Sequence, residues 1–286
     1  MTVQPRAAAQ TAVLAALAVL AAGCASAGPA LRARSASAPP VCDTPFVVGH
    51  RGSPRTAPEN TMASFDSALD QGADWLETDV QTTRDGVPVL MHDATVDRTT
   101  NGKGAVGDLT AAQVAALRVT IGPGPAQPVP TLEQLLERLD GSNATLLMEI
   151  KWQRTPEDVT RIARIAAGSG AHVVLYSFSA DHLRRAHAAA PALPMVLIQG
   201  SGLAENPGDL PLRGVALEST LAGAARIAEE RKAGREVYVW TVDDEENWQT
   251  MAARGADGLI TDLPGPARRW ADANCRPERR VAPRGH

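Results

Sequence analysis

The sequence predicts an α/β fold, a TIM (β/α)8 barrel with a short insertion after its second strand. Short apolar runs rich in Val, Ile and Leu alternate with helix-like segments, as in repeated βα units on a parallel sheet. Eight such runs are spread over about 220 residues, whereas a doubly wound sheet would usually have fewer strands. With 286 residues, of which 44% are hydrophobic, the chain is long enough to bury the core of such a barrel.

The expected strands are the apolar runs, and a helix is expected after each of them. In chain order the strands are residues 46–49, 75–80, 144–150, 172–176, 193–199, 214–218, 236–242 and 257–261. Thr155 and Pro156 predict the start of one helix, because threonine caps helices and proline is favoured at the first helical position. The expected apolar stripes are Val159, Ile162, Ala163 and Ala166 for this helix, and Leu221, Ala224, Ala225 and Ala228 for a later one.

The second strand is expected to continue into a hairpin. Asp85 and Gly86 separate it from the apolar run 87–91, and an Asp-Gly pair between two such runs is a strong hairpin signal. If these are the two turn residues, the antiparallel register places His92 opposite Asp79, on the same face. A bulge at the turn would shift this register.

Residues 94–129 are expected to form a lid or rim on the barrel. About 36 residues rich in Gly and Pro can hardly form a domain with its own core. The segment contains the pattern Gly-x-Gly-x-x-Gly at 102–107, which binds dinucleotides when it joins a strand to a helix. Here the pattern follows polar residues, so we interpret it as loop glycine.

The N-terminal part is expected to be a targeting segment outside the fold. The apolar run 12–22 is too short for the ~20 residues of a membrane-spanning helix, so residues 1–23 are interpreted as a signal peptide. Cys24 is a candidate lipidation site, because residues 20–24 resemble a bacterial lipoprotein box. Residues 25–27 fit a signal-peptidase site instead. Either way we expect an exported protein, anchored to the cell membrane through Cys24 or secreted.

The expected barrel also sets the remaining segment boundaries and suggests how two of the cysteines pair. Residues 24–41 are interpreted as a flexible tether, 42–276 as the barrel and 277–286 as a disordered tail. Cys42 and Cys275 stand just before the first strand and just after the last helix. Because a closed barrel brings its ends together and exported proteins keep disulfides, we expect these two cysteines to be joined. Two unrelated thiols are the alternative.

Charged residues gather at the ends of the expected strands, where catalytic groups of such barrels lie. Glu77 and Asp79 are two residues apart and so share one face of the second strand, and Glu149 ends the third. Three converging carboxylates suit one hard divalent cation, Ca²⁺ or Mg²⁺, as cofactor. The alternative is an internal salt-bridge network with Arg51 and Lys151.

Two histidines, His50 and His92, are expected at the same mouth. With Arg51 and Lys151 to bind phosphate oxygens, one imidazole can accept the proton of the attacking hydroxyl or water and the other can protonate the leaving alkoxide. This set suits hydrolysis of a phosphodiester, whereas a sugar isomerase or aldolase would less naturally need His50 and Arg51 together. The histidines interpreted as surface or core residues are His172, His182, His187 and His286.

Several motifs, in order from about residue 46 to 266, resemble those of the glycerophosphodiester phosphodiesterase family. They are His50-Arg51-Gly52, Pro58-Glu59-Asn60-Thr61, Glu77-Thr78-Asp79-Val80, Asp85-Gly86-x-Pro88-Val89 with His92-Asp93, Arg98-Thr99-Thr100-x-Gly102-x-Gly104, Pro130-Thr131-Leu132, Glu149-Ile150-Lys151 and Thr261-Asp262-x-Pro264. The resemblance implies a TIM barrel, a calcium or magnesium ion, and hydrolysis of glycerophosphodiesters to glycerol 3-phosphate and an alcohol.

Carried over position by position, the resemblance also implies roles for individual residues. The implied roles are metal ligands for Glu77, Asp79 and Glu149, an acid/base pair for His50 and His92, a phosphate contact for Arg51, and substrate-cavity residues for Lys151 and Trp240. Glu59 lies in a family motif near the mouth. It either contacts the substrate or only stabilises the start of a helix.

The leading hypothesis is therefore an exported, metal-dependent glycerophosphodiester phosphodiesterase with a small-molecule substrate. The aromatic content of 3% favours a short polar headgroup. A lysophospholipase D acting on lysolipids and a non-catalytic binding lipoprotein are the alternatives. The formal charge of -4, without a basic run, argues against nucleic acid as a partner, and no protein partner is expected.

Overall fold

The computed structural model describes residues 44–151, 153, 155–202 and 205–275. Eight parallel strands close into a barrel, because β1 pairs with both β11 and β2 and the others pair in chain order. The barrel strands are β1 Phe46–Gly49, β2 Trp75–Thr82, β6 Thr145–Ile150, β7 His172–Ser177, β8 Met195–Gln199, β9 Gly214–Glu218, β10 Glu236–Trp240 and β11 Gly258–Thr261. The predicted TIM barrel is confirmed.

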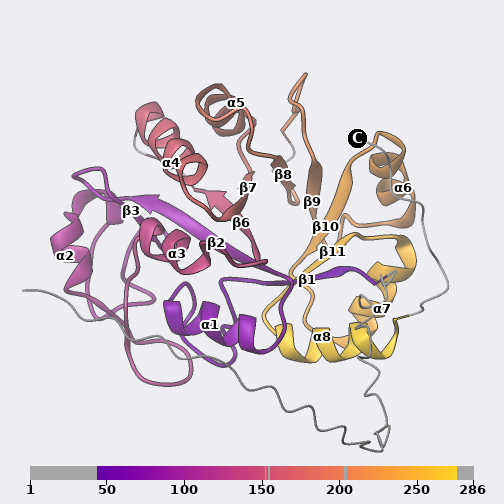
Figure 1. Ribbon diagram of the computed structural model, residues 1–286, viewed down its shortest axis with the longest axis horizontal. Helices are drawn as coiled ribbons and strands as arrows, with labels where there is room; N and C mark the ends of the chain where they lie inside the picture. Colours follow the sequence, from indigo (N-terminus) through magenta and orange to yellow (C-terminus); the bar gives the residue numbers. More distant parts are fainter. Residues whose placement is uncertain (1–43, 152, 154, 203–204, 276–286) are drawn as a thin grey trace, which may run out of the picture. The chain divides into compact units, whose positions relative to one another are not determined.

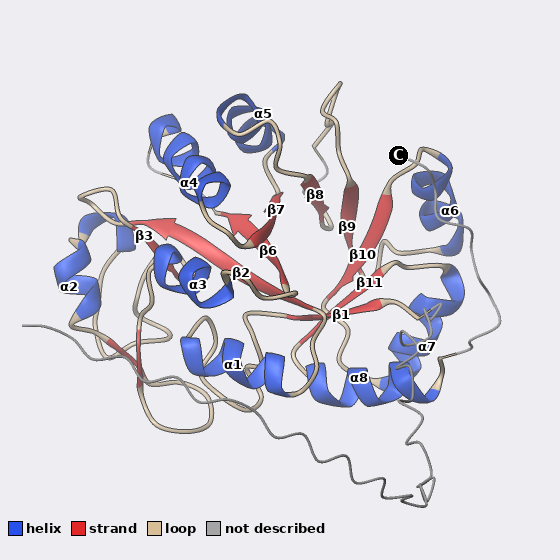
Figure 2. Cartoon of the chain, in the orientation of Figure 1, coloured by secondary structure: helices blue, strands red, loops and turns tan. Residues whose placement is uncertain are grey.

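Helices surround the strands (Figures 1 and 2). Those that follow barrel strands are α1 Met62–Asp70, α3 Leu132–Leu139, α4 Pro156–Gly168, α5 Ala180–Ala189, α6 Ala224–Lys232, α7 Glu245–Arg254 and α8 Pro264–Ala273. After β8, the described residues 200–202 and 205–213 form no helix, so our expectation of a helix after every strand was wrong there. Glycines and prolines recur in this connection and disfavour a helix.

The start of α4 agrees with the prediction from sequence. The Thr155 side chain accepts a hydrogen bond from the Asp158 amide, and Pro156 is the first helical residue. The four residues of the predicted stripe are buried against the barrel. The capping residues therefore predicted where this helix begins, and the apolar spacing predicted which of its faces is buried.

The stripe predicted for α6 was wrong. Its members are exposed, Leu221 by 37%. The helix instead buries Ile227 and Glu230, and the Glu230 carboxylate forms ion pairs with Arg226 and Arg235. Because part of the buried face is ionic, the apolar spacing of the sequence does not mark it.

Apolar side chains fill the barrel below its mouth. This inner layer consists of Val48, Trp75, Leu147, Val174, Tyr176, Val196, Ile198, Ala216, Tyr238 and Ile260. Residues at alternate positions point outward and pack under the helices in two further clusters. His50, Glu77 and Glu149 stand two residues beyond members of the inner layer, so they point inward at the carboxyl ends of their strands.

The hairpin after β2 differs from its predicted register by one residue. β3, Pro88–Leu90, pairs antiparallel with β2 and leaves three residues in the turn, not two. Gly86, at a φ of +86°, allows this bulged turn. The amide of Met91 donates to the Asp79 carbonyl at 2.9 Å, so our prediction that His92 pairs with Asp79 was wrong.

The insertion has more structure than we expected. It forms η1 Val106–Asp108, α2 Ala111–Ala115 and a two-stranded sheet of β4 Arg118–Val119 and β5 Gln127–Pro128. A small buried cluster consists of Val89, Met91, Val96, Val106, Val114, Val119 and Val129. Because Val89 and Met91 belong to the hairpin segment, the insertion shares this core with the extension of β2. Figure 1 shows α2 beside β3 at this end of β2.

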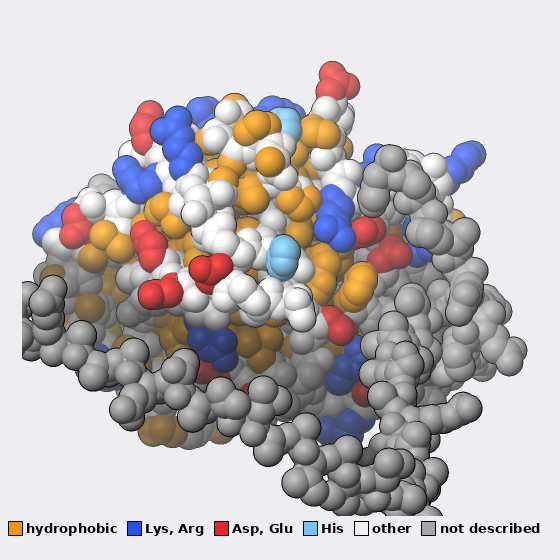
Figure 3. Space-filling view, in the orientation of Figure 1, with side chains coloured by type: hydrophobic (Ala, Val, Ile, Leu, Met, Phe, Trp, Pro, Cys, Tyr) orange, Lys and Arg blue, Asp and Glu red, His pale blue; other side chains and the backbone are white. Residues whose placement is uncertain are grey.

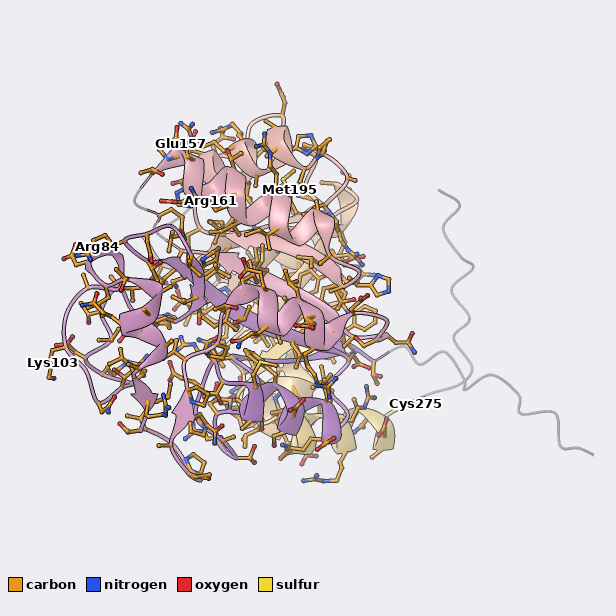
Figure 4. All side chains as sticks on the ribbon, turned by 60° about the vertical axis from the view of Figure 1, so that its left-hand side comes forward. Arg84, Lys103, Glu157, Arg161, Met195 and Cys275 are labelled. Atoms are coloured by element: carbon orange, nitrogen blue, oxygen red, sulfur yellow. The ribbon has the colours of Figure 1, made fainter. Side chains whose placement is uncertain are left out.

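The glycine pattern at 102–107 runs from a loop into η1 and does not join a strand to a helix. The Gly104 amide donates to the Asp97 carboxylate at 2.7 Å. Lys103 projects from the outer edge of the insertion (Figure 4). The interpretation as loop glycine therefore agrees with the local structure.

Several predictions for the two ends lie outside the described residues. They are the signal peptide 1–23, the tether 24–41, lipidation at Cys24, the pairing partner Cys42, and the tail 277–286. Cys275, at the end of α8 (Figure 4), is disulfide-bonded, and its pairing with Cys42 stays a prediction. Among the described helices, none is long and apolar enough to cross a membrane.

Candidate active site

Three carboxylates come together inside the carboxyl end of the barrel. Glu77 and Asp79 lie two residues apart on β2, and the β2–β6 register places Glu149 beside Asp79. All three side chains are buried, and one oxygen of each lies within 4.8 Å of the others. They form an all-oxygen cluster that could hold a metal ion.

Two cations border the carboxylate cluster. Arg51 Nε lies 3.3 Å from Asp79 Oδ2, and Lys151 Nζ lies 2.9 Å from Glu149 Oε1 and 3.5 Å from Asp79 Oδ1. Glu77 accepts a hydrogen bond of 2.9 Å from the backbone amide of Arg51. The ion pairs of the alternative interpretation are thus present, yet these two cations face three carboxylates. A bound cation would neutralise the remaining charge.

The pKa values of the carboxylates differ because their neighbours differ. Burial raises the pKa of Glu77 well above its usual value, and the charges of Asp79 and Glu149 raise it further. Burial and the charge of Asp79 raise the pKa of Glu149 to about 8. Burial acts upward on the pKa of Asp79 too, but Arg51 and Lys151 outweigh it and lower that pKa. Without a bound cation, the ionised form is therefore disfavoured at the two glutamates and favoured at Asp79.

The loop after β1 brings Arg51 and Asn60 to the cluster in an uncommon backbone conformation. Their φ angles are +50° and +54°, in the left-handed region that few non-glycine residues adopt. The Asn60 amide donates to Asp79 Oδ2 at 2.8 Å, and its carbonyl accepts from the Thr78 hydroxyl at 2.8 Å. Asn60 stood in a quoted motif, but sequence reasoning assigned it no role, although asparagine adopts a left-handed backbone more readily than most residues.

His50 is oriented by a carboxylate from a neighbouring strand. Its Nδ1 lies 2.7 Å from Oδ1 of Asp262, which follows β11, the strand that pairs with β1. The amide of Asp262 donates to Asp243 Oδ1 at 2.8 Å. Because an ionised aspartate only accepts, Nδ1 carries the hydrogen, and Nε2 remains for proton exchange.

His92 enters the same cavity from the segment after the hairpin, although its predicted pairing was wrong. Its Nδ1 lies 2.7 Å from Asp93 Oδ1. Arg98 of the insertion donates two hydrogen bonds to Asp93, of 2.7 and 3.1 Å, which lowers the pKa of Asp93 to about 2. Burial lowers the pKa of His92, and the charge of Asp79 opposes this effect.

Glu59 lies between two arginines. Arg98 donates to both of its carboxylate oxygens, at 2.7 and 3.0 Å, and Arg51 donates to Oε1 at 3.0 Å. Hydrogen bonding to Arg98 and the charge of Arg51 overcome the effect of burial and lower the pKa of Glu59. The predicted site residue Glu59 therefore holds Arg51 in place and links it to the insertion.

The converging side chains line a cavity of about 110 Å³. Predicted site residues in its wall are His50, Arg51, Glu77, Asp79, His92, Glu149, Lys151 and Trp240. Phe178 and Tyr176 are further wall residues. The Trp240 indole donates to the Ala216 carbonyl at 3.2 Å and meets Phe178 edge to face, with ring centres 5.7 Å apart. These contacts fix the aromatic side of the cavity.

A larger cavity of about 490 Å³ adjoins the first one. The two cavities share His92, Glu149, Lys151 and Phe178. The other wall residues of the larger cavity are Asp93, Ala94, Ile150, Ser177, Ser179 and His182. Our interpretation of His182 as an ordinary surface or core residue missed this position, because its sequence surroundings do not differ from those of other helical histidines.

The exposed charges are mixed in sign. On the face seen in Figure 3, Lys and Arg side chains are interspersed with Asp and Glu side chains. Many belong to ion pairs, such as Arg138 with Asp66 at 2.9 Å and Arg185 with Asp181 at 2.7 Å.

Comparison with known proteins gives this geometry a context. Residues 50–266 match the model of the glycerophosphoryl diester phosphodiesterase family. A glycerophosphodiester phosphodiesterase of Caldanaerobacter subterraneus subsp. tengcongensis is 35% identical over 231 residues, which cover 77% of this chain and 94% of that protein.

Solved structures are similar as well. The glycerophosphodiester phosphodiesterase of Agrobacterium tumefaciens is 31% identical, with a TM-score of 0.65 over 80% of this chain and 100% of that one. A phosphodiesterase of Oleispira antarctica, solved with the product sn-glycerol-3-phosphate, is 24% identical, with a TM-score of 0.73 over 80% of this chain and 97% of that one. The latter similarity shows the fold.

Proposed function

The chain belongs to the glycerophosphoryl diester phosphodiesterase family, and from this premise we propose that it hydrolyses glycerophosphodiesters to glycerol 3-phosphate and an alcohol. One observation carries the proposal: a carboxylate cluster, two cations and two imidazoles line a single cavity. Cleavage of a phosphodiester needs charge neutralisation at phosphorus and proton transfer at two oxygens, and this set of groups suits both needs.

Glu77, Asp79 and Glu149 would hold one divalent cation, Ca²⁺ or Mg²⁺. The donors fit such an ion, because all are carboxylate oxygens, and burial together with the neighbouring carboxylates raises the pKa of both glutamates, an effect that a cation would offset. When bound, the ion neutralises charge on the phosphate and favours ionisation of the attacking water.

Arg51 and Lys151 would bind the non-bridging phosphate oxygens. Both side chains line the smaller cavity, and both are already fixed by ion pairs with the carboxylates. Arginine offers a planar fork of donors and lysine a point charge. Because Glu59 also holds Arg51, the guanidinium is preorganised for the phosphate.

His50 would be the general base and His92 the general acid. His92 lines both cavities, whereas His50 lines the smaller one of the two. With the phosphate in the smaller cavity, an alcohol that extends into the larger one has its bridging oxygen near His92. Nε2 of His50 takes a proton from water as the water oxygen bonds to phosphorus. Nε2 of His92 gives a proton to the alcohol oxygen as its bond to phosphorus breaks.

A substrate panel tests the reaction. The purified protein is assayed with glycerophosphoglycerol, glycerophosphocholine and lysophosphatidylcholine, with glycerol 3-phosphate and the free alcohol as readouts. We expect turnover of the glycerophosphodiesters. Turnover of lysophosphatidylcholine alone would replace the proposal with a lysophospholipase D, and binding without turnover of any diester would favour a non-catalytic protein.

Chelation tests the metal assignment. Removal of divalent cations should abolish turnover, and Ca²⁺ or Mg²⁺ should restore it. Glu149→Gln keeps the size of the side chain but removes a carboxylate, so calorimetry should show loss of metal affinity together with loss of turnover. Glu229→Gln, on the exposed face of α6, is the matched control. Full activity of the metal-free protein would refute the ligand assignment.

We also propose that the protein is exported. The apolar run 12–22 and the disulfide bond of Cys275 support this, since disulfides persist in oxidising compartments. A lipid anchor on Cys24 is tested by metabolic labelling with a fatty acid. Label in the wild type that is lost in Cys24→Ser supports the anchor, and an unlabelled exported protein supports secretion.

A further inference from the structure

The larger cavity is the candidate binding site for the alcohol part of the diester. We propose that this cavity binds the leaving alcohol and that it favours an uncharged alcohol, such as glycerol or another polyol, over choline or ethanolamine. The proposal rests on the function proposed above and names the class of diester that the same site prefers.

The sizes of the two cavities support the location. The smaller cavity, of about 110 Å³, has the predicted phosphate contacts Arg51 and Lys151 in its wall, so the phosphate is placed there. The larger cavity, of about 490 Å³, lies across a boundary formed by His92, Glu149, Lys151 and Phe178. A diester with its phosphate in the smaller cavity therefore has space for its alcohol on the His92 side.

The charges of the larger cavity support an uncharged ligand. Beyond the shared boundary, its uncharged wall residues are Ala94, Ile150, Ser177, Ser179 and His182. His182 belongs to this group because burial lowers its pKa. The remaining carboxylate in this wall is Asp93, and two hydrogen bonds from Arg98 already compensate its charge. An ammonium group would find no spare counter-charge among these residues.

A cationic headgroup would also meet Lys151. Its Nζ lies 6.0 Å from the centre of the Phe178 ring, the aromatic surface that a trimethylammonium group would otherwise use. A trimethylammonium group would therefore compete with Lys151 for this aromatic surface, whereas an uncharged alcohol does not need it. The Ser179 hydroxyl accepts from the His182 amide at 3.4 Å, so its hydrogen can be donated to an alcohol oxygen.

Ser179 allows a sharp test because it both lines the cavity and caps α5. Ser179→Asp places a carboxylate in the cavity wall, and aspartate is as good a helix cap as serine. Ser179→Asn makes a change of similar size and capping ability without the charge. Thr131→Asp makes the same change of charge at the cap of α3, a residue of neither cavity.

The experiment compares kcat/KM for glycerophosphoglycerol, glycerophosphocholine and glycerophosphoethanolamine. We expect the wild type to prefer the uncharged ester by about tenfold, and Ser179→Asp to shift the ratio towards the cationic esters by about tenfold. Ser179→Asn and Thr131→Asp should keep the wild-type ratio, which would assign the shift to charge in this cavity.

Three results would overturn parts of this picture separately. A wild type that prefers the cationic esters contradicts the uncharged class. A ratio that Ser179→Asp leaves unchanged, in a protein that still turns over, contradicts the location of the alcohol. If the wild type hydrolyses no diester, the proposed function itself fails, and the alcohol site fails with it.

Discussion

The two histidine–aspartate pairs of the mouth have the same internal geometry and different surroundings. In both, an aspartate oxygen lies 2.7 Å from Nδ1 of the imidazole. His50 and Asp262 come from the closing seam of the barrel, 212 residues apart in sequence. His92 and Asp93 are adjacent residues of the hairpin segment. One histidine–aspartate pair is thus formed by residues that directly follow barrel strands, and the other by residues of the segment after the hairpin.

The difference lies in what compensates each aspartate. Arg98 donates two hydrogen bonds to Asp93, of 2.7 and 3.1 Å. The cation beside Asp262 is Arg55, 3.9 Å away and 61% exposed, so solvent screens it. The negative charge of Asp262 is therefore compensated less than that of Asp93. It can stabilise the protonated form of His50, which a general base forms during the reaction. Asp93 shares its charge with Arg98, which favours proton release from His92.

The largest expected effect separates the two imidazoles by leaving group. On an alkyl diester, His50→Ala and His92→Ala should each lower kcat by about 10²–10⁴-fold. On glycerophospho-p-nitrophenol, whose leaving group needs no proton, His92→Ala should recover most of its activity and His50→Ala should not. Steady-state kinetics on both esters measure this, with the exposed His172→Ala as the control. Recovery in His50→Ala instead would reverse the assignment of acid and base.

A smaller effect compares the aspartates directly. Asparagine keeps an oxygen for the Nδ1 hydrogen but removes the charge. Asp262→Asn should therefore lower kcat by about 10–100-fold, because little else compensates a protonated His50. Asp93→Asn should cost several-fold less, since Arg98 already offsets that charge. Equal losses would show that the aspartates act by orientation alone.

Arg98 connects the second pair to the phosphate site, so its replacement sharpens the comparison. Without the guanidinium, Asp93 acts with its full charge on His92, which raises the pKa of that imidazole. The protonated acid then persists to higher pH, and the alkaline limb of the kcat profile of Arg98→Gln should move to higher pH. KM should also rise, because Glu59 loses a partner and holds Arg51 less firmly.

Controls for Arg98 use both chemistry and position. Arg98→Lys keeps the charge but not the planar fork, so it should restore the pH profile in part only. Arg118→Gln removes an arginine of the same insertion that donates to backbone carbonyls of Ala115 and Leu117, and it should leave the profile unchanged. A profile that moves to lower pH in Arg98→Gln would contradict the compensation of Asp93.

The sequence predicts the barrel well because burial on both faces of a parallel sheet leaves continuous apolar runs. The carboxylates that end β2 and β6 are predictable for a related reason: two-residue spacing on a strand keeps Glu77 and Asp79 on one face. The hairpin register was missed because Gly86 supports a three-residue turn as well as a two-residue one.

The partners of the histidines were harder to predict. Asp93 and Asp262 stood in recognised motifs, but only the fold brings Asp262 to His50 across the β1–β11 seam. Arg98 belongs to the insertion, where the sequence has no helical or strand periodicity. Its contacts with Asp93 and Glu59 could therefore not be predicted from spacing. His182 is placed in a cavity wall by the connection after β7. Contacts between loops that are distant in sequence depend on the positions of individual side chains. The pattern of residue types does not predict these positions.

The smallest effect on turnover is expected far from both pairs, at Cys275. Because barrel helices run back from the mouth, the end of α8 lies at the opposite face of the barrel. Reduction should lower Tm and leave kcat at moderate temperature unchanged.

If Cys42 is the partner, the closed loop is long, and the chain-entropy model gives about 5 kcal/mol as an upper estimate. Cys42→Ser should then lower Tm as reduction does, and Cys24→Ser should not. The reverse result would assign the bond to Cys24, and a loss of kcat well below the new Tm would show that the mouth depends on it.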